Sequence, residues 1–113
     1  MMSETELTDA VIEMAGWTGW LRHHDRPAQN RRGDWATHIQ GDVGFTDLVL
    51  ARDGRVLFAE LKSETGKFTD EQFAWGMAIK SDRPDATHEY HEWRPSEWLD
   101  GTIEKVLKRE GKR

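Results

Sequence analysis

The stretch Asp47-Leu-Val-Leu-Ala-Arg-Asp-Gly-Arg-Val-Leu-Phe-Ala-Glu-Leu-Lys62 decides how this chain folds. Two apolar runs that are rich in β-branched residues flank Asp53-Gly54. Asp-Gly between such runs is a strong signal for a β-hairpin, because a tight hairpin turn needs two residues that accept positive φ. The sequence therefore predicts two antiparallel strands joined by a two-residue turn.

Counting outward from that turn gives the register of the hairpin. Arg52 pairs with Arg55, and Asp47 then lies opposite Glu60, with their Cβ atoms ~5 Å apart on one face of the sheet. Side chains alternate along a strand, so Lys62 shares the face of Glu60. The opposite face carries the residues expected in the core: Leu48, Leu50, Leu57 and Leu61.

The Asp47–Glu60 pair predicts a cation site. Like charges directly opposite each other destabilise a sheet, so a folded domain rarely keeps them unless a cation lies between them. A divalent metal is the obvious candidate. The alternative is a solvated sheet face on which Lys62 neutralises one of its neighbours. A register shifted by one residue would remove the arrangement altogether.

Motifs in and around the hairpin carry a family resemblance. Gly44-Phe-Thr-Asp-Leu48, Glu60-Leu-Lys62 and Gly66-Lys-Phe-Thr-Asp-Glu-Gln72 resemble the VRR-NUC branch of the PD-(D/E)XK nuclease superfamily. The resemblance extends to residues 3–15 and to Trp93-Arg-Pro95, and so covers most of the chain. It implies an α/β fold of the α+β type: a restriction-endonuclease-like αβββαβ core with a mixed sheet flanked by helices, followed by a C-terminal helix.

The resemblance also implies roles for individual residues. Glu4, Asp47 and Glu60 would hold Mg²⁺ or Mn²⁺. Lys62 would assist catalysis and Gln72 would lie beside the site, so the implied catalytic residues are Asp47, Glu60, Lys62 and Gln72. Without the resemblance, Glu4 is a first-turn acid that the helix dipole favours.

Two positions depart from the family pattern. Thr46 stands where the family usually has proline, and Thr8 stands where glutamine is frequent. Because Asp47 itself is kept, we expect the first change to alter backbone stiffness rather than the chemistry. The second change would weaken the support that the first helix gives to the site.

Two capping boxes predict helices before and after the hairpin. Ser3 with Glu6 starts a helix that Gly16 ends, and Thr69 with Gln72 starts the second helix. Gln72 therefore has an alternative role as a capping residue.

The remaining elements come from weaker patterns. Loose alternation predicts strands at residues 18–24 and 87–93. Residues 25–43 have no convincing period, and a loop of that length is usually functional or mobile. The predicted order is αβββαβα in a single domain, residues 1–113. Pro95 opens one last helix, whose apolar stripe is Trp98, Ile103, Val106 and Leu107.

The composition limits the class of protein. With 113 residues, 33% charged and 36% apolar, the chain should form one domain with a thin core to which six tryptophans contribute much of the volume. Homodimer formation would stabilise such a core. The absence of cysteine excludes disulfides and thiolate zinc sites, and no apolar run resembles a membrane span or a signal peptide. We therefore expect an intracellular, cytoplasmic protein, in the host cytoplasm if a phage encodes it.

Basic residues are clustered although the net charge is −5. Residues 21–33 and residues 101–113 each carry a net charge of +3, and the rest of the chain carries −11. Local phosphate-binding surfaces are therefore expected, unless these charges are merely solvated. Arginines and an aromatic ring in the long loop suit a nucleic-acid clamp. The residues expected to contact DNA are Arg22, His24, Arg26, Arg31, Arg32 and Lys67.

Together these patterns favour a metal-dependent endonuclease that hydrolyses DNA phosphodiester bonds. Its expected substrates are branched, flapped or Holliday-junction DNA, cut by a homodimer with Mg²⁺ or Mn²⁺ as cofactor. The alternative is a DNA-binding accessory protein that kept the nuclease fold and has little or no cleavage activity. Such a protein would be free to lose the unfavourable acid pair, which is present here. A nuclease acting on RNA is a third candidate, since nothing in the sequence recognisably reads a 2′-hydroxyl.

Overall fold

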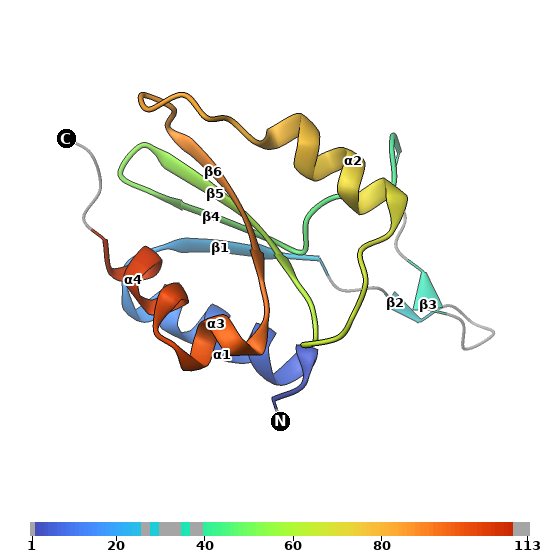
Figure 1. Cartoon of the computed structure of the whole chain (residues 1–113), viewed down its shortest axis with the longest axis horizontal. Coiled ribbons are helices and arrows are strands. Elements are labelled where there is room, and N and C mark those ends of the chain that lie inside the picture. Colours follow the sequence, from blue (N-terminus) through green and yellow to red (C-terminus); the bar gives the residue numbers. More distant parts are fainter. Residues whose placement is uncertain (1, 26–27, 30–34, 37–39, 110–113) are drawn as a thin grey trace.

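The structure is a computed structural model that describes residues 2–25, 28–29, 35–36 and 40–109. An N-terminal helix, a four-stranded mixed sheet and further helices make an α+β domain (Figure 1). In the described part of the chain, every helix is too short or too polar to cross a lipid bilayer. In chain order the elements are α1 (Glu4–Trp17), β1 (Leu21–His24), β2 (Ala28–Gln29), β3 (Trp35–Ala36), β4 (Leu48–Arg52), β5 (Arg55–Leu61), α2 (Asp70–Ile79), β6 (His88–Trp93), α3 (Pro95–Leu99) and α4 (Thr102–Lys108).

The central hairpin has the predicted turn and register. Asp53 (φ 51°) and Gly54 (φ 79°) form the tight turn between β4 and β5, which pair antiparallel. Both turn residues have the positive φ that matches the twist of the strands. The ladder extends through the first residue of β4, so its continuation brings Asp47 to the position opposite Glu60.

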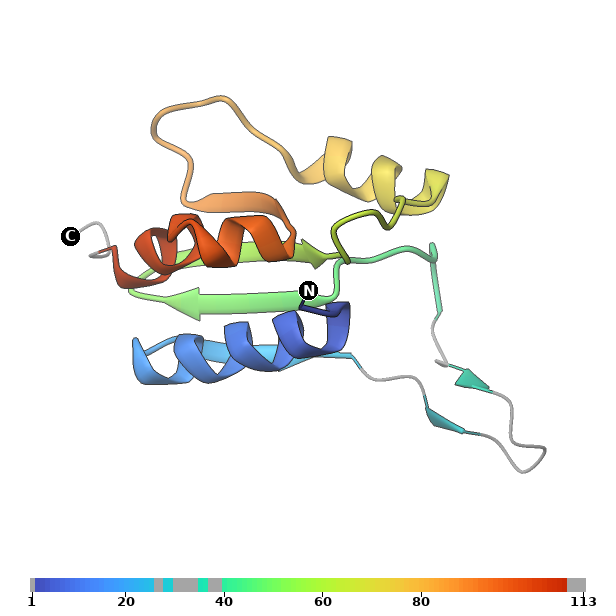
Figure 2. The same cartoon turned by 60° about the horizontal axis from the view of Figure 1, so that its bottom comes forward.

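The hairpin is the centre of a sheet with strand order β1-β4-β5-β6. β1 and β5 pair antiparallel with β4, whereas β6 pairs parallel with β5 and needs the crossover that α2 supplies. Helices α1, α3 and α4 cover one face of the sheet, and α2 lies over the other (Figure 1, Figure 2). We call the first the core face, which carries Leu50 and Leu57, and the second the α2 face, which carries Phe58 and Glu60.

The hydrophobic core lies between the core face and the helices that cover it. The four leucines predicted to face the core have no exposed surface. Tryptophan contributes less than predicted: in the described residues only Trp20 and Trp93 are buried, and Trp17 is 84% exposed because it lies off the stripe of α1 that faces the sheet. The buried apolar residues are Leu7, Val11, Ala15, Trp20, Leu48, Leu50, Leu57, Ala59, Leu61, Trp93, Ile103 and Leu107.

Several element boundaries differ from the sequence prediction. The first helix continues through Gly16 to Trp17, so β1 begins only at Leu21. The predicted last helix is two helices, because Gly101 adopts φ 86° between α3 and α4. The predicted loop at residues 25–43 contains the short antiparallel pair of β2 and β3.

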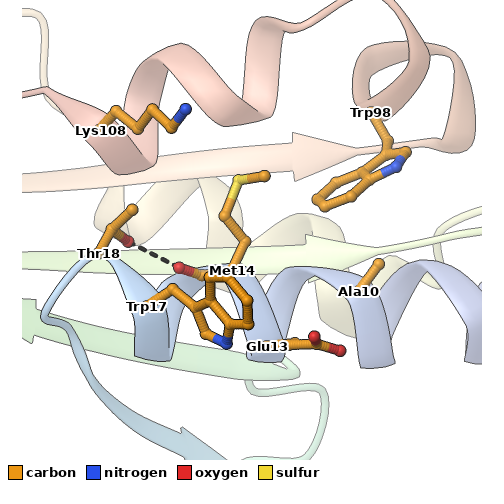
Figure 3. A pocket seen from close by; sticks show the side chains of 7 residues that line it. All are labelled: Ala10, Glu13, Met14, Trp17, Thr18, Trp98 and Lys108. Atoms are coloured by element: carbon orange, nitrogen blue, oxygen red, sulfur yellow. Dashed lines mark hydrogen bonds between the residues drawn. The ribbon is translucent and has the colours of Figure 1, made fainter.

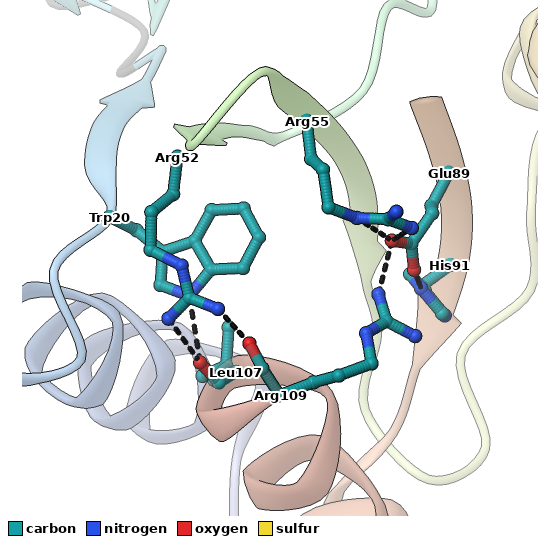
Figure 4. A network of polar contacts seen from close by, with 7 residues as sticks. All are labelled: Trp20, Arg52, Arg55, Glu89, His91, Leu107 and Arg109. Atoms are coloured by element: carbon teal, nitrogen blue, oxygen red, sulfur yellow. Dashed lines mark hydrogen bonds and ion pairs between the residues drawn. The ribbon is translucent and has the colours of Figure 1, made fainter. Parts of the chain in front are cut away.

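Arg52 ties the turn end of the sheet to the helices (Figure 4). It donates hydrogen bonds to the carbonyls of Thr18 (2.8 Å) and Leu107 (3.1 Å). These carbonyls lie at the ends of α1 and α4, where a helix leaves its last C=O groups without intrahelical partners. The guanidinium group also lies 4.5 Å from the ring centre of Trp20. One side chain therefore joins β4 to two helix ends.

Glu89 lies in the same network, on the core face (Figure 4). Its carboxylate accepts hydrogen bonds from Arg55 and Arg109 and is 2.9 Å from His91 Nε2. Burial alone would raise the pKa of Glu89, but the hydrogen bonds from Arg109, Arg55 and His91 outweigh burial and lower the pKa to about 2. This acid is fully compensated.

Candidate active site

The two acids of the hairpin come together on the α2 face, at the end of the sheet away from the turn. Glu60 is fully buried near the end of β5, and Asp47 is half-buried just before β4. The backbone N–H of Leu61 donates to Asp47 Oδ2 at 3.0 Å. This hydrogen bond holds the Asp47 carboxylate against β5, beside Glu60.

Glu60 is only partly satisfied by its neighbours. Gln72 Nε2 donates to its Oε1 at 3.2 Å, but its Oε2 is buried and has no hydrogen-bond partner among the described residues. Burial raises the pKa of Glu60 to about 9. The adjacent Asp47 adds to the rise, first by accepting a hydrogen bond from the protonated form and then by its negative charge, whereas the charge of Lys62 opposes it. Without a cation, the Glu60 carboxyl is therefore protonated at neutral pH.

Gln72 serves the helix cap and the site at the same time. Its backbone N–H donates to Thr69 Oγ1 (3.1 Å), and its Oε1 accepts from the Thr69 N–H (2.9 Å), which confirms the predicted capping box. The same side chain reaches Glu60 through Nε2. The two roles are compatible because a carboxamide carries both an acceptor and two donors.

The segment before β4 holds α2 over the site, a role that sequence analysis missed. Gly44 adopts φ 93° and passes so close to α2 that an added Cβ would lie 2.6 Å from Glu71 Cβ. Trp75 Nε1 donates to the Val43 carbonyl at 3.0 Å, and the ring centres of Trp75 and Phe45 are 4.9 Å apart. The only signal in the sequence is the glycine itself, which permits both the positive φ and the close approach.

β6 adds Tyr90 and Glu92 to the α2 face, and neither was predicted at the site. Glu92 is the parallel partner of Glu60, so the two side chains lie on the same face. The Tyr90 hydroxyl is buried with no hydrogen-bond partner in the described chain. Burial, followed by the charges of Glu92 and Glu60, raises the pKa of Tyr90. Lys80 Nζ lies 3.7 Å from Glu92 and balances part of this negative charge.

Lys62 continues the α2 face directly after β5. Its backbone N–H donates to the Trp93 carbonyl at 3.1 Å, which extends the contact between β5 and β6. Its charge lowers the pKa of Glu60, although burial and Asp47 prevail. Lys62 therefore lies near enough to the acid pair to contribute positive charge to it.

The residues fit a divalent cation held by two carboxylates. With both groups ionised, a buried oxygen of Glu60 without a partner in the described chain, next to the Asp47 carboxylate, is unfavourable unless a cation binds both; without a cation, Glu60 avoids this cost by keeping its proton. Carboxylate oxygens are also the ligands that Mg²⁺ and Mn²⁺ prefer. The predicted third ligand, Glu4, is exposed at the start of α1, and its charge contributes to the raised pKa of Glu60. Among the described residues no three acidic or histidine side chains are grouped to hold a metal, so Glu4 does not complete a ligand set.

The two positions that depart from the pattern of the family that the sequence resembles are both buried threonines. Thr46 is 2% exposed, and its hydroxyl has no hydrogen-bond partner within the described ranges. Thr8 donates through Oγ1 to the Glu4 carbonyl at 2.9 Å. Thr8 therefore bonds within the first turns of α1.

The predicted DNA-contact residues are not brought together at the acid pair. Arg22 and His24 pair with core-facing leucines of β4 and so lie on the core face. Arg22 donates to the Ile12 carbonyl at 3.2 Å, a contact that packs β1 against α1. Lys67 is exposed between β5 and α2. The other three predicted contacts lie outside the described residues: Arg26, Arg31 and Arg32.

A hollow of about 450 Å³ lies between α1 and the two C-terminal helices (Figure 3). Its walls are mainly apolar, and Trp17 at its edge is strongly exposed. The lining carries one acid, Glu13, and one base, Lys108. This combination suits contact with a protein surface rather than catalysis. The lining residues are Ala10, Glu13, Met14, Trp17, Thr18, Trp98 and Lys108.

Comparison of the chain with known protein families, with curated proteins and with solved structures gives no match.

Proposed function

We propose that the protein is a metal-dependent endonuclease that hydrolyses DNA phosphodiester bonds at the Asp47–Glu60 pair, with Mg²⁺ or Mn²⁺ as cofactor, in the cytoplasm. The observation that carries the proposal is Glu60 Oε2, a buried carboxylate oxygen without a partner in the described chain, beside a second carboxylate. The doubly ionised pair is costly without a cation, so Glu60 keeps its proton until a cation binds.

The order of elements supports a restriction-endonuclease-like core. Apart from the short β2–β3 pair, the described chain runs α1-β1-β4-β5-α2-β6. This is the αβββαβ order that the family resemblance implies. Glu60 lies on β5, and Asp47 and Lys62 directly flank the β4–β5 hairpin, which agrees with the positions that the resemblance implies.

Each residue of the site has a distinct task in the proposed reaction. When bound, Mg²⁺ or Mn²⁺ polarises the scissile phosphate and lowers the pKa of a water ligand. Asp47 and Glu60 would hold the cation, and Gln72 keeps Glu60 oriented through its 3.2 Å hydrogen bond. Lys62 directs N–H donors at the attacking water or at the phosphate oxygens, where negative charge grows in the transition state.

Cleavage of labelled DNA tests the proposal. Linear, flapped and four-way-junction DNAs are each incubated with the protein in Mg²⁺, Mn²⁺ or chelator. We expect cleavage with either metal, faster on branched DNA, and none in chelator. A labelled RNA in the same series tests the third candidate, because preferential RNA cleavage would reassign the substrate.

The alternative function is a DNA-binding accessory protein with little or no cleavage activity. The cost of the acid pair disfavours it, because binding to phosphates needs no buried carboxylate. DNA binding without cleavage of any substrate in either metal would favour this alternative.

We further propose that two copies of the chain meet at the hollow between α1 and α4. In a twofold dimer the hollow of one copy packs against the hollow of the other. Glu13 of one copy can therefore face Lys108 of the other. The exposed Trp17 supplies apolar area to such an interface. Light scattering should give a dimer for wild type and a monomer for Trp17→Ser. A dimer that persists in Trp17→Ser would place the interface elsewhere.

A further inference from the structure

An aromatic ring, rather than an acid, holds the ammonium group of Lys62. Lys62 Nζ lies 5.6 Å from the ring centre of Phe68. The ammonium group forms no ion pair with any residue that the structure describes. The negative face of the ring attracts the positive charge without using its N–H groups. Those donors therefore stay available to a phosphate or a water molecule.

The connection after β5 returns Phe68 to Lys62. The Gly66 N–H donates to the Ser63 carbonyl at 3.3 Å and closes a turn directly after Lys62. Gly66 packs so tightly here that an added Cβ would lie 2.9 Å from Ser63 Oγ and 3.6 Å from Lys62 Cδ. The lysine side chain therefore runs beside this turn and ends at the Phe68 ring.

Arg94 fixes the same ring and the same turn. Its Cζ lies 5.3 Å from the ring centre of Phe68. Its Nη1 donates to the carbonyls of Ser63 (2.6 Å) and Glu64 (3.2 Å). Glu64 Oε1 accepts from the Ser96 N–H at 2.9 Å, so the turn is tied to the start of α3.

We infer that Phe68, anchored by Arg94, is a positioning residue for the Lys62 ammonium group. The catalytic consequence rests on the proposed function, whereas the placement of the ammonium group can be tested without it. A lysine side chain has a long flexible stem, so it loses much conformational freedom when it is held in one place. Where no acid holds it, the ring and the turn set the direction of its donors.

NMR of the lysine ε-methylene groups tests the placement directly. Aromatic ring currents should shift the Lys62 ε-methylene protons in wild type, and Phe68→Leu should return them to the position of an exposed lysine. Phe68→Tyr keeps the ring and should keep the shift. Lys80, which lies 5.4 Å from the Tyr90 ring centre, is the internal control and should not change in either variant. An unchanged Lys62 signal in Phe68→Leu would overturn the inference.

Kinetics then test the consequence for catalysis. Misplacing a group by about 1 Å can cost about 100-fold in rate, so kcat should fall by about 10- to 100-fold in Phe68→Leu with KM unchanged. Phe68→Tyr should restore kcat. The matched control is Phe73→Leu, which alters a phenylalanine on α2 that is 61% exposed and should leave kcat unchanged. A normal kcat in Phe68→Leu would overturn the catalytic role.

A second variant covers the case in which Phe68→Leu does not fold. Arg94→Gln keeps the ring but removes its anchor, so both the Lys62 shift and kcat should decrease. Unchanged values of both in Arg94→Gln would contradict the anchoring role. If wild type cleaves no nucleic acid, the proposed function fails, and the NMR comparison alone decides whether Phe68 places the ammonium group.

Discussion

Glu60 and Glu89 sit on neighbouring strands of one sheet, and their surroundings differ in almost every respect. Glu89 lies on the core face near the turn, where two arginines and His91 bond its carboxylate and lower its pKa to about 2. Glu60 lies on the α2 face at the far end, where burial and Asp47 raise its pKa to about 9. One glutamate, Glu89, is thus stabilised as an anion at the turn end of the sheet, and the other, Glu60, is stabilised as a neutral acid at the opposite end.

The difference separates an acid whose charge the fold compensates from one that keeps a buried oxygen without a partner in the described chain. Arg55 and Arg109 compensate Glu89 fully, so its charge contributes to the stability of the sheet. Glu60 has one hydrogen bond from Gln72 and an oxygen without a partner in the described chain, so its anionic form needs a cation from outside. Folding alone does not explain why a buried acid would be left in this state.

The largest expected effect is the loss of DNA cleavage in Glu60→Gln, which makes the side chain at this position permanently neutral. The substitution keeps the shape of the side chain and removes the charge that a metal needs. Cleavage of DNA should fall by at least about 100-fold, while the melting temperature in chelator stays the same or rises. Glu89→Gln, measured below its own melting temperature, should keep its kcat. Full cleavage by Glu60→Gln under matched conditions would remove Glu60 from the site.

The second effect is on stability, in Glu89→Gln. This change removes the negative charge that pairs with Arg55 and Arg109, although the amide oxygen can still accept a hydrogen bond, and should cost about 2 to 3 kcal/mol in the free energy of unfolding, or roughly 10 °C in melting temperature. Urea and thermal unfolding measure both. The control is Glu104→Gln, which breaks the exposed ion pair with Lys108 and should cost less than about 1 kcal/mol. Equal losses in the two variants would mean that the Glu89 network contributes no more than a surface pair.

The sequence predicts the surroundings of Glu60 better than those of Glu89. The reason is that residues close together in the sequence determine much of the first site, whereas residues far apart in the sequence form the second. Asp53-Gly54 predicts a two-residue turn, and that turn fixes the register of the hairpin. Counting outward from the turn then places Asp47 opposite Glu60. The capping box similarly predicts the start of α2 and thus the location of Gln72. These are local signals that depend on a few consecutive residues.

β6 and α4 also contribute neighbours to the two glutamates, and these contacts join residues that are far apart in the sequence. No local sequence pattern predicts them. Glu92 reaches Glu60, and Glu89 reaches Arg55, only because β6 pairs parallel with β5 after the crossover through α2. Arg109 joins Glu89 because Gly101 redirects the chain into α4, where the stripe of apolar residues suggested one continuous helix. The contribution of the six tryptophans to the core was overestimated for a similar reason, because only the packing of α1 against the sheet decides that Trp17 lies on the exposed side.

The third effect is a different pH dependence of stability for each glutamate. The pKa of Glu60 in the folded protein lies above the ordinary value of 4.5, so the unfolded chain loses this proton first, and stability falls from pH 4.5 to about 9. The folded pKa of Glu89 lies below 4.5, so its contribution is present above that pH and is lost as the pH falls toward 2. Each slope is at most about 1.4 kcal/mol per pH unit.

Urea unfolding in chelator from pH 2 to 9 resolves the two limbs. Glu60→Gln should flatten the alkaline limb, and Glu89→Gln should flatten the acid limb. Saturating Mg²⁺ should also flatten the alkaline limb of wild type, because a bound cation removes the reason for Glu60 to keep its proton. An alkaline limb that is unchanged in Glu60→Gln would assign the slope to another group.

The smallest effect isolates the repulsion between the two acids, in Asp47→Asn. The amide oxygen can still accept the Leu61 N–H, so the substitution removes the charge and keeps the hydrogen bond. At pH 9 in chelator, where Glu60 is partly ionised, the variant should be more stable than wild type by about 0.5 to 1 kcal/mol. At pH 6 Glu60 is protonated and the gain should vanish. Mg²⁺ at ~100 times its dissociation constant should reverse the ranking, because it stabilises wild type by roughly 2.7 kcal/mol and the variant by much less. The control is Asp53→Asn in the exposed turn, which should show neither the pH dependence nor the reversal. If Asp47→Asn is the less stable protein at pH 9 without metal, the two carboxylates do not repel each other, and burial alone keeps the proton on Glu60.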